Sequence, residues 1–163
     1  MKYILFFFIS LVSINCYLSI LPKQTREIIA PDANKIILSF DMPADSLFLL
    51  VNDFLMYQNY RILTSNQELA YIYTDGKYVG QSLNMRLNIQ ITGNDENSKL
   101  NCKAEWILDP TIDEAPAWRE STMLLGGFFR LSYEKMVLDL QKLPYKEIQF
   151  VKDQFIVTYP VRQ

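Results

Sequence analysis

Histidine is absent from this chain of 163 residues. The absence removes the side chain that most often serves as a general base near neutral pH, and with it the commonest zinc ligand in proteins. Catalytic Ser-His-Asp and Cys-His arrangements and HExxH metal sites are therefore excluded. The sequence shows no motif for other catalytic chemistry, so we predict a protein that is not an enzyme and that has no cofactor and no metal.

An excess of positive charge is also missing, because 16 basic residues face 18 acidic ones and the formal net charge is −2. Binding to the phosphate backbone of nucleic acids depends on clustered Lys and Arg. Nucleic acid is therefore not an expected partner. The chain is half apolar, which is the composition of one ordinary globular domain. A domain of this length folds without a disulfide or a structural metal.

The longest apolar run lies within residues 1–16, which read MKYILFFFISLVSINC. One lysine precedes an apolar stretch that ends at Val12, and small or polar residues follow, which is the pattern of a signal peptide. A transmembrane anchor needs about 20 continuous apolar residues, and Ser13, Asn15 and Ser19 interrupt the stretch. We therefore predict a signal peptide and an exported protein, with a retained anchor as the alternative.

Cysteine is rare, with one at the end of this segment and one in the middle of the chain. The sequence Ser13-Ile14-Asn15-Cys16 resembles a bacterial lipobox, although Asn15 stands where Gly, Ala or Ser is usual. It implies lipidation of Cys16 and membrane anchoring through the lipid in the bacterial cell envelope, on the periplasmic side or at the surface. Cleavage by the general signal peptidase is the alternative. In that case the protein is secreted and Cys16 is discarded with the peptide.

Residues 17–34 contain two prolines among mixed polar residues and are predicted to form a tether, so that the single domain spans 35–163. The domain begins with the alternation of a half-buried strand: Ile36, Leu38, Phe40 and Met42. Pro43 and Asp45 are typical of a helix start. An apolar stripe follows at helical spacing: Leu47, Leu50, Val51, Phe54 and Leu55.

Three more strands are predicted around 69–73, 83–91 and 100–108, because apolar and polar residues alternate there. Cys102 lies on an apolar side of this alternation and is predicted to be a buried thiol. Strands with one apolar and one polar face indicate an antiparallel sheet that is covered on one side only. A second helix is predicted from Glu120 to Leu143, and the tail after it has room for another strand.

The predicted order is β-α-β-β-β-α, with room for extra terminal strands, and the fold class is α+β: an antiparallel β-sheet with two helices packed on one face. This order resembles the TATA-binding-protein-like and helix-grip arrangements. Taken with the export signal, it looks like the small secreted or lipoprotein domains of unknown function with such a fold from Bacteroidota. The resemblance covers about residues 27–143 and rests on element order and spacing. The resemblance implies that the protein is exported, and it assigns a function to no residue.

The polar face of the sheet is the first candidate site. It carries few charges and is predicted to dock an envelope protein or a glycan, or else to be merely solvated, through Asn84, Arg86, Asn88, Gln90, Asn101, Lys103 and Glu105. The loop from Asp109 to Trp118 is a second candidate for partner contact. Four aromatic residues are either a binding surface or ordinary strand residues: Tyr71, Tyr73, Tyr78 and Trp106.

A glycine pair inside an apolar run of the second helix is the other candidate feature. Glycine costs a helix about 1 kcal/mol per residue, so the pair indicates close packing or a kink that opens a cavity. Such a cavity between helix and sheet would hold a small apolar ligand and be lined by Trp118, Gly126, Gly127, Phe128 and Phe129. The acidic residues of the preceding loop fit neither an EF-hand nor another named site, and are interpreted as solvated: Asp109, Asp113, Glu114 and Glu120.

The function predicted from these patterns is that of a non-enzymatic cell-envelope lipoprotein or secreted binding module that acts through a protein partner. The alternative is a carrier or sensor of a small apolar ligand between the second helix and the sheet. An enzyme is the third hypothesis, and a polar cleft that gathers carboxylates and a tyrosine would favour it.

Overall fold

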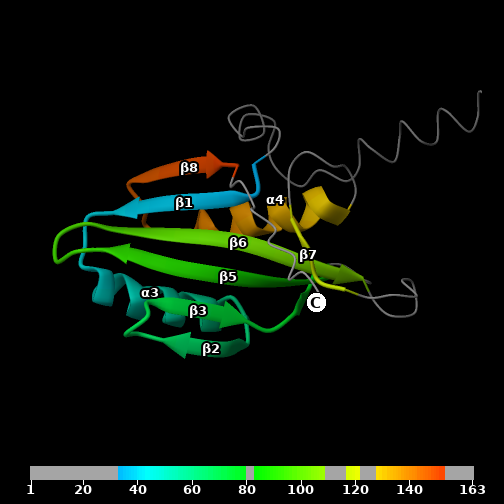
Figure 1. The fold of residues 1–163 in the computed structure, drawn as a ribbon, viewed down its shortest axis with the longest axis horizontal. Coiled ribbons are helices and arrows are strands. Elements are labelled where there is room, and N and C mark those ends of the chain that lie inside the picture. Colours follow the sequence, from blue (N-terminus) through cyan, green and yellow to red (C-terminus); the bar gives the residue numbers. More distant parts are fainter. Residues whose placement is uncertain (1–32, 80–82, 109–116, 122–127, 153–163) are drawn as a thin grey trace, which may run out of the picture.

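The computed structural model describes residues 33–79, 83–108, 117–121 and 128–152 (Figure 1). Several predictions fall outside the described residues: the signal peptide with Cys16, most of the tether, Asp109, Asp113, Glu114, Gly126 and Gly127. The prediction of a mixed α+β chain with an antiparallel sheet and two helices is confirmed. Among the described residues, no helix is both long and apolar enough to cross a membrane.

The chain enters the fold through β1 (Lys35–Phe40), whose side chains alternate between core and surface. Helix α3 (Ala44–Tyr57) begins directly after Pro43, with Asp45 in its first turn, where a carboxylate meets the positive end of the helix dipole. After α3 the chain turns through Asn59, which has a φ of 60°. The helix buries one stripe of side chains: Leu47, Phe48, Val51 and Leu55.

Seven strands and the second helix follow. In chain order they are β2 (Ile62–Asn66), β3 (Tyr71–Thr74), β4 (Lys77–Tyr78), β5 (Leu83–Gly93), β6 (Ser98–Leu108), β7 (Arg119–Glu120), α4 (Phe128–Leu140) and β8 (Glu147–Val151). The sheet has the order β2-β3-β5-β6-β1-β8, with β4 added to β5 and β7 added to β6. All of these pairings are antiparallel.

The long hairpin of β5 and β6 forms the centre of the sheet. At its turn Gly93 pairs with Ser98. The side-chain oxygen of Asn94 closes the turn, because it accepts hydrogen bonds from the backbone N–H groups of Glu96 and Asn97 at 3.0 and 2.9 Å. Over most of both strands every second residue is buried, so one face of the hairpin belongs to the core.

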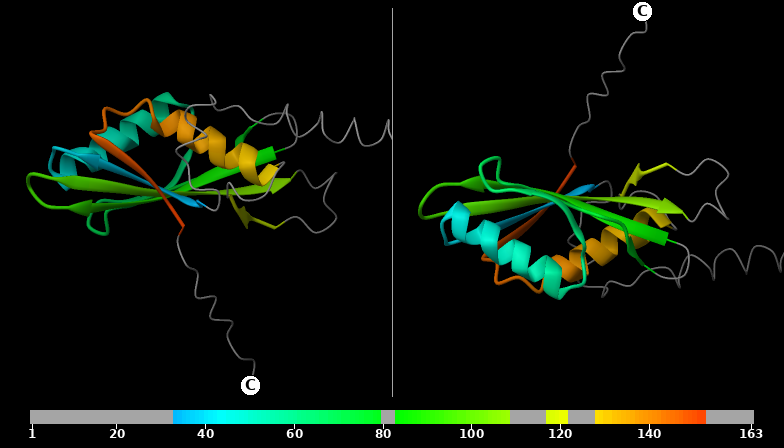
Figure 2. Two further views of the ribbon diagram at one scale, coloured as in Figure 1. Left: turned by 90° about the horizontal axis from the view of Figure 1, so that it is seen from above. Right: turned by 90° about the horizontal axis from the view of Figure 1, so that it is seen from below.

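Helices α3 and α4 lie on the same side of the sheet, as the two views in Figure 2 show. The buried strand residues form one core with residues of both helices. Its largest fully buried side chains include Trp106, Tyr133, Phe40, Ile36 and Leu38. No described helix lies over the opposite side of the sheet. We call that side the open face.

The second helix does not begin at Glu120, and that prediction is wrong. Glu120 belongs to β7 and pairs with Glu105, and the N–H of Ser121 donates to the carbonyl oxygen of Ala104 at 2.9 Å. Strand β1 covers the same edge of β6 only as far as Lys103. The backbone groups of β6 beyond that residue pair with β7 instead, and this pairing overrides the helix-start signal of the acidic residue.

Candidate functional site

The open face carries the residues of the predicted docking face. All seven are half-buried or exposed there: Asn84, Arg86, Asn88, Gln90, Asn101, Lys103 and Glu105. Tyr71 and Tyr73 of β3 share this face, because they pair with open-face residues of β5. Trp106 does not, since it is only 2% exposed and belongs to the core. Tyr78 lies on the short strand β4 and is 62% exposed.

Four residues of the open face form one contact that we call the arginine stack: Tyr73, Arg86, Glu105 and Trp118. The Arg86 guanidinium lies 4.8 Å from the centre of the Tyr73 ring and 4.0 Å from the centre of the Trp118 ring. Glu105 Oε2 accepts a hydrogen bond from Arg86 Nε at 2.6 Å and one from the Tyr73 hydroxyl at 3.2 Å. Cation–π contacts and a charge-assisted hydrogen bond thus hold both rings in one arrangement.

The tyrosines at the stack hold their protons more tightly than free tyrosine. Burial, followed by the charge of Glu105, raises the pKa of both Tyr73 and Tyr71. The two rings are nearly parallel, with an angle of 15° between their planes and 6.3 Å between their centres. Both hydroxyls are therefore neutral at physiological pH and able to donate hydrogen bonds, as the Tyr73 hydroxyl does to Glu105.

Trp118 reaches the stack because Gly76 leaves room for its ring. A Cβ atom at position 76 would lie 3.1 Å from the nearest ring atom of Trp118, which is closer than most such contacts. Trp118 was predicted to line an apolar pocket under the second helix, but its ring lies against Arg86, one of the open-face residues of β5. Of the other predicted pocket residues, Phe128 and Phe129 begin α4, and the two glycines lie outside the described residues.

Beside the stack the open face has a hollow of about 340 Å³, which we call the lysine hollow. It is lined by Lys35, Asn88, Gln90, Asn101 and Lys103, which come from β1, β5 and β6. Lys103 lies directly opposite Lys35 on one side and Asn88 on the other. None of the lining residues is acidic. Glu120, in β7, forms an ion pair with Lys103, with 3.5 Å between Glu120 Oε1 and Lys103 Nζ.

A second hollow, of about 260 Å³, lies at the turn of the long hairpin. It also contains two lysines, Lys99 and Lys146, but two carboxylates share its lining, Asp41 and Glu147. The Nζ atom of Lys146 lies 3.0 Å from Asp41 Oδ1. The formal charges of the residues that line this hollow therefore balance.

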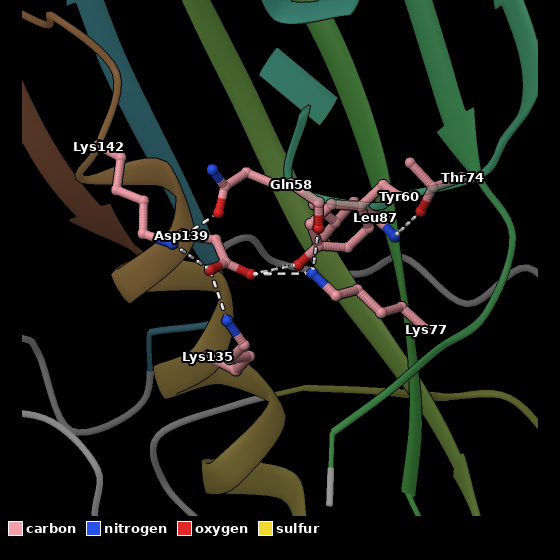
Figure 3. Close-up of polar contacts among 8 residues, drawn as sticks. All are labelled: Gln58, Tyr60, Thr74, Lys77, Leu87, Lys135, Asp139 and Lys142. Carbon is pink, nitrogen blue, oxygen red and sulfur yellow. Dashed lines mark hydrogen bonds and ion pairs between the residues drawn. The ribbon is translucent and has the colours of Figure 1, made fainter. Parts of the chain in front are cut away.

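On the helix side of the sheet, a buried carboxylate gathers three lysines (Figure 3). Asp139 of α4 has a side chain only 1% exposed. It accepts hydrogen bonds from the Tyr60 hydroxyl at 2.7 Å, from Lys135 Nζ at 2.5 Å and from Lys142 Nζ at 3.1 Å. Lys77 of β4 lies 4.0 Å from the same carboxylate and 4.1 Å from the centre of the Tyr60 ring.

Opposing effects set the proton affinities in this cluster. Burial acts to raise the pKa of Asp139, but the hydrogen bonds from Lys135 and Tyr60 outweigh burial and lower it. Burial, with the Asp139 charge, raises the pKa of Tyr60. Burial lowers the pKa of Lys77, against the attraction of Asp139. The carboxylate is therefore ionised and Tyr60 neutral at physiological pH.

The cluster is best explained as a structural clamp. Helix α3 ends at Tyr57 and α4 at Leu140, close to these residues, and the negative ends of helix dipoles favour lysines. Lys77 also donates a hydrogen bond to the carbonyl oxygen of Gln58 at 2.5 Å, so β4 is tied to the end of α3.

Metal or thiol chemistry finds no support among the described residues. They contain no group of three or more His, Cys, Asp or Glu side chains that could hold a metal ion. Cys102 is buried, and burial raises the pKa of its thiol. This placement confirms the prediction that Cys102 is a buried thiol.

Neither the arginine stack nor the Asp139 cluster was predicted from the sequence. The spacing of Lys135, Asp139 and Lys142 is a visible signal, because residues three or four apart meet on a helix. Tyr60 gives no such signal, since it lies 79 residues before Asp139 in the chain. In comparisons with known proteins, no family model and no curated protein matches this sequence.

Proposed function

We propose that this chain is a non-enzymatic, exported binding module that docks a protein partner through the open face of its sheet. The arginine stack is the observation that carries the proposal. Tyr, Trp and Arg are the residues most enriched where protein interfaces concentrate their binding energy. Here one of each meets on a face over which no described helix lies.

The stack is also already ordered before any partner arrives. Glu105 holds both the Arg86 guanidinium and the Tyr73 hydroxyl, and the Trp118 ring covers Arg86. Binding normally costs about 0.5–1.5 kcal/mol for each long side chain that it immobilises. Because these side chains are held in the free protein, the stack avoids much of that cost. The proposal includes the predicted packing of both helices on one face, since that packing leaves the other face accessible.

A photo-crosslinking experiment tests the docking face. The photoreactive amino acid p-benzoylphenylalanine is placed at Asn88 on the open face or, as the matched control, at the exposed Asp53 on α3. Illumination of cells that produce each variant is expected to give one discrete protein adduct from position 88 and none from position 53. No adduct from position 88, or the same adducts from both positions, would contradict the proposal.

The proposed location rests on Cys16 and is tested separately. Intact-mass spectrometry of the membrane-purified protein is expected to show a chain that begins at Cys16 and carries added acyl mass. The Cys16→Ala variant is expected to lose that mass and to leave the membrane fraction, because the lipid supplies the anchor. A chain cut elsewhere without lipid would instead indicate secretion, and an uncut Met1 would indicate a retained anchor.

A further inference from the structure

The hollow of about 260 Å³ at the turn of the long hairpin is a separate feature of the molecule, and we call it the hairpin hollow. Its volume is below the roughly 300–1,000 Å³ of pockets that hold drug-sized molecules, so it suits a smaller ligand. Ser39 lines it and alternates with the buried residues Leu38 and Phe40 on β1, which places Ser39 on the open face. Ser39 pairs with Lys99 of β6 on one side and with Glu147 of β8 on the other.

Lys99 and Glu147 carry opposite charges in one row across the sheet, yet they do not pair with each other. Residues two strands apart have their Cα atoms about 10 Å from each other. Within the described residues Lys99 Nζ has no ion-pair partner, and the Glu147 side chain accepts a hydrogen bond from Gln149 Nε2 at 2.9 Å. The other two charges of the hollow neutralise each other, with Lys146 Nζ 3.0 Å from Asp41 Oδ1. One ammonium and one carboxylate therefore remain on opposite sides of a small serine.

This arrangement selects a ligand that carries both charges. A ligand with a single charge would be attracted by one side of the hollow and repelled by the other, at a separation close to the Debye length of about 8 Å in physiological salt. A zwitterion satisfies both sides. The hydroxyls of Ser39 and Thr92 and the amide of Asn97 also line the hollow, and each can donate and accept hydrogen bonds. The N–H and C=O groups of a peptide bond are complementary to them.

The lining also indicates which kind of cation the ligand carries. Quaternary ammonium groups are recognised by cages of aromatic rings. Phe40 is the one aromatic residue in the described lining of the hairpin hollow, and its side chain is buried in the core. A primary ammonium instead donates hydrogen bonds to carboxylate and hydroxyl oxygens, which Glu147 and Ser39 supply. Peptides with a free amino terminus carry such a group, and an extended dipeptide is only about 7 Å long.

We propose that the hairpin hollow binds short zwitterionic peptides, with the terminal carboxylate at Lys99 and the terminal ammonium at Glu147. This inference goes beyond the proposed function, because the site shares no residue with the arginine stack and needs no protein partner. The strands that supply Lys99, Ser39 and Glu147 are paired along their length, so the sheet itself fixes the order of the three side chains.

An NMR titration with L-alanyl-L-alanine tests the inference. The dipeptide is expected to shift the backbone amide signals of residues that line the hairpin hollow and to leave those of the arginine stack unchanged. Lys99→Gln and Glu147→Gln are each expected to weaken binding about threefold, which is the effect of one exposed charge. The double variant Arg61→Gln/Asp75→Asn removes an exposed ion pair elsewhere and is expected to bind like the wild type. The amide spectrum of each variant shows whether it is folded.

Blocked dipeptides assign each charge to its partner. N-acetylation removes the ammonium group, so the acetylated dipeptide should bind more weakly than the free one and should not respond to Glu147→Gln. C-terminal amidation removes the carboxylate, so the amidated dipeptide should not respond to Lys99→Gln. Glycine betaine has a quaternary ammonium group and is expected not to bind.

Three results would overturn the inference. The first is the absence of shifted signals at the hairpin hollow, and the second is equal binding of the free and blocked dipeptides. The third is an equal loss of binding in the Arg61→Gln/Asp75→Asn control, which would indicate an unspecific effect of charge. Binding of glycine betaine as tight as that of the dipeptide would refute the recognition of a primary ammonium. The proposed function fails separately, through the absence of a crosslinked adduct at position 88.

Discussion

At the scale of single residues, Asp139 shows how a buried charge is made tolerable. Burial of an isolated carboxylate is costly, and the chain offsets that cost with a tyrosine hydroxyl and lysine ammonium groups. The lysines remain partly exposed, with 27% of the Lys135 side chain and 52% of the Lys142 side chain accessible. Because they are partly exposed, water still solvates their ammonium groups. This solvation lowers the desolvation penalty of the cluster, and it also limits the strength of each ion pair.

Removal of this carboxylate is expected to have a pH-dependent effect. At neutral pH the Asp139→Asn variant should lose about 2 kcal/mol of unfolding free energy, because charge-assisted hydrogen bonds are lost. The pKa of Asp139 in the folded protein is below its ordinary value of 3.8. Its contribution is therefore complete above that ordinary value and is lost as the pH falls through the folded pKa.

Denaturant unfolding at a series of pH values measures this effect. The difference between wild type and Asp139→Asn should be constant near neutral pH and should shrink in acid. The exposed Asp53→Asn variant is the control and should unfold like the wild type throughout. A difference that persists unchanged in acid would show that the lowered pKa does not contribute to stability.

At the scale of secondary-structure elements, the hairpin of β5 and β6 depends on a glycine at its turn. Gly93 has a φ of 153°, and a Cβ atom there would lie 2.4 Å from the backbone oxygen of Asn97. Neither the backbone angle nor the space suits another residue. The Gly93→Ala variant should therefore lose about 1–3 kcal/mol of stability.

Thermal unfolding checks this expectation against Thr92→Ala, an exposed neighbour whose replacement should change the melting temperature little. A loss of 1 kcal/mol corresponds to a fall of a few degrees in a domain of this size. Equal melting temperatures for the two variants would mean that the turn relaxes at low cost, contrary to the geometry.

Strands could be predicted where apolar and polar residues alternate within one continuous stretch of the sequence. Strands β5 and β6 alternate cleanly over 11 residues each, so their pairing and their polar face follow from the sequence. Strand β2 was missed, because only its end residues are partly buried and its alternation is weak. Strand β7 was missed because its formation depends on where β1 ends along β6, which no local pattern records.

At the scale of the whole molecule, the candidate site also contains residues that a local pattern predicts and residues that it does not. Residues of the polar face could be named in advance, because they alternate with buried ones on two strands. The arginine stack could not be predicted, because it requires the Trp118 ring to contact Arg86 from a distant part of the chain. It also requires Gly76 to leave space for that ring. Such contacts depend on the tertiary arrangement of three separate segments.

The place of β1 in the sheet has a consequence for the order of folding. This strand is the first one made in the described fold, yet it lies between β6 and β8, so its pairing partners begin at Ser98 and Glu147. Contacts between residues so far apart in sequence slow folding, because long loops must close first. Synthesis must therefore reach Val151 before β1 can gain both neighbours, and until then the N-terminal part of the chain stays incompletely folded.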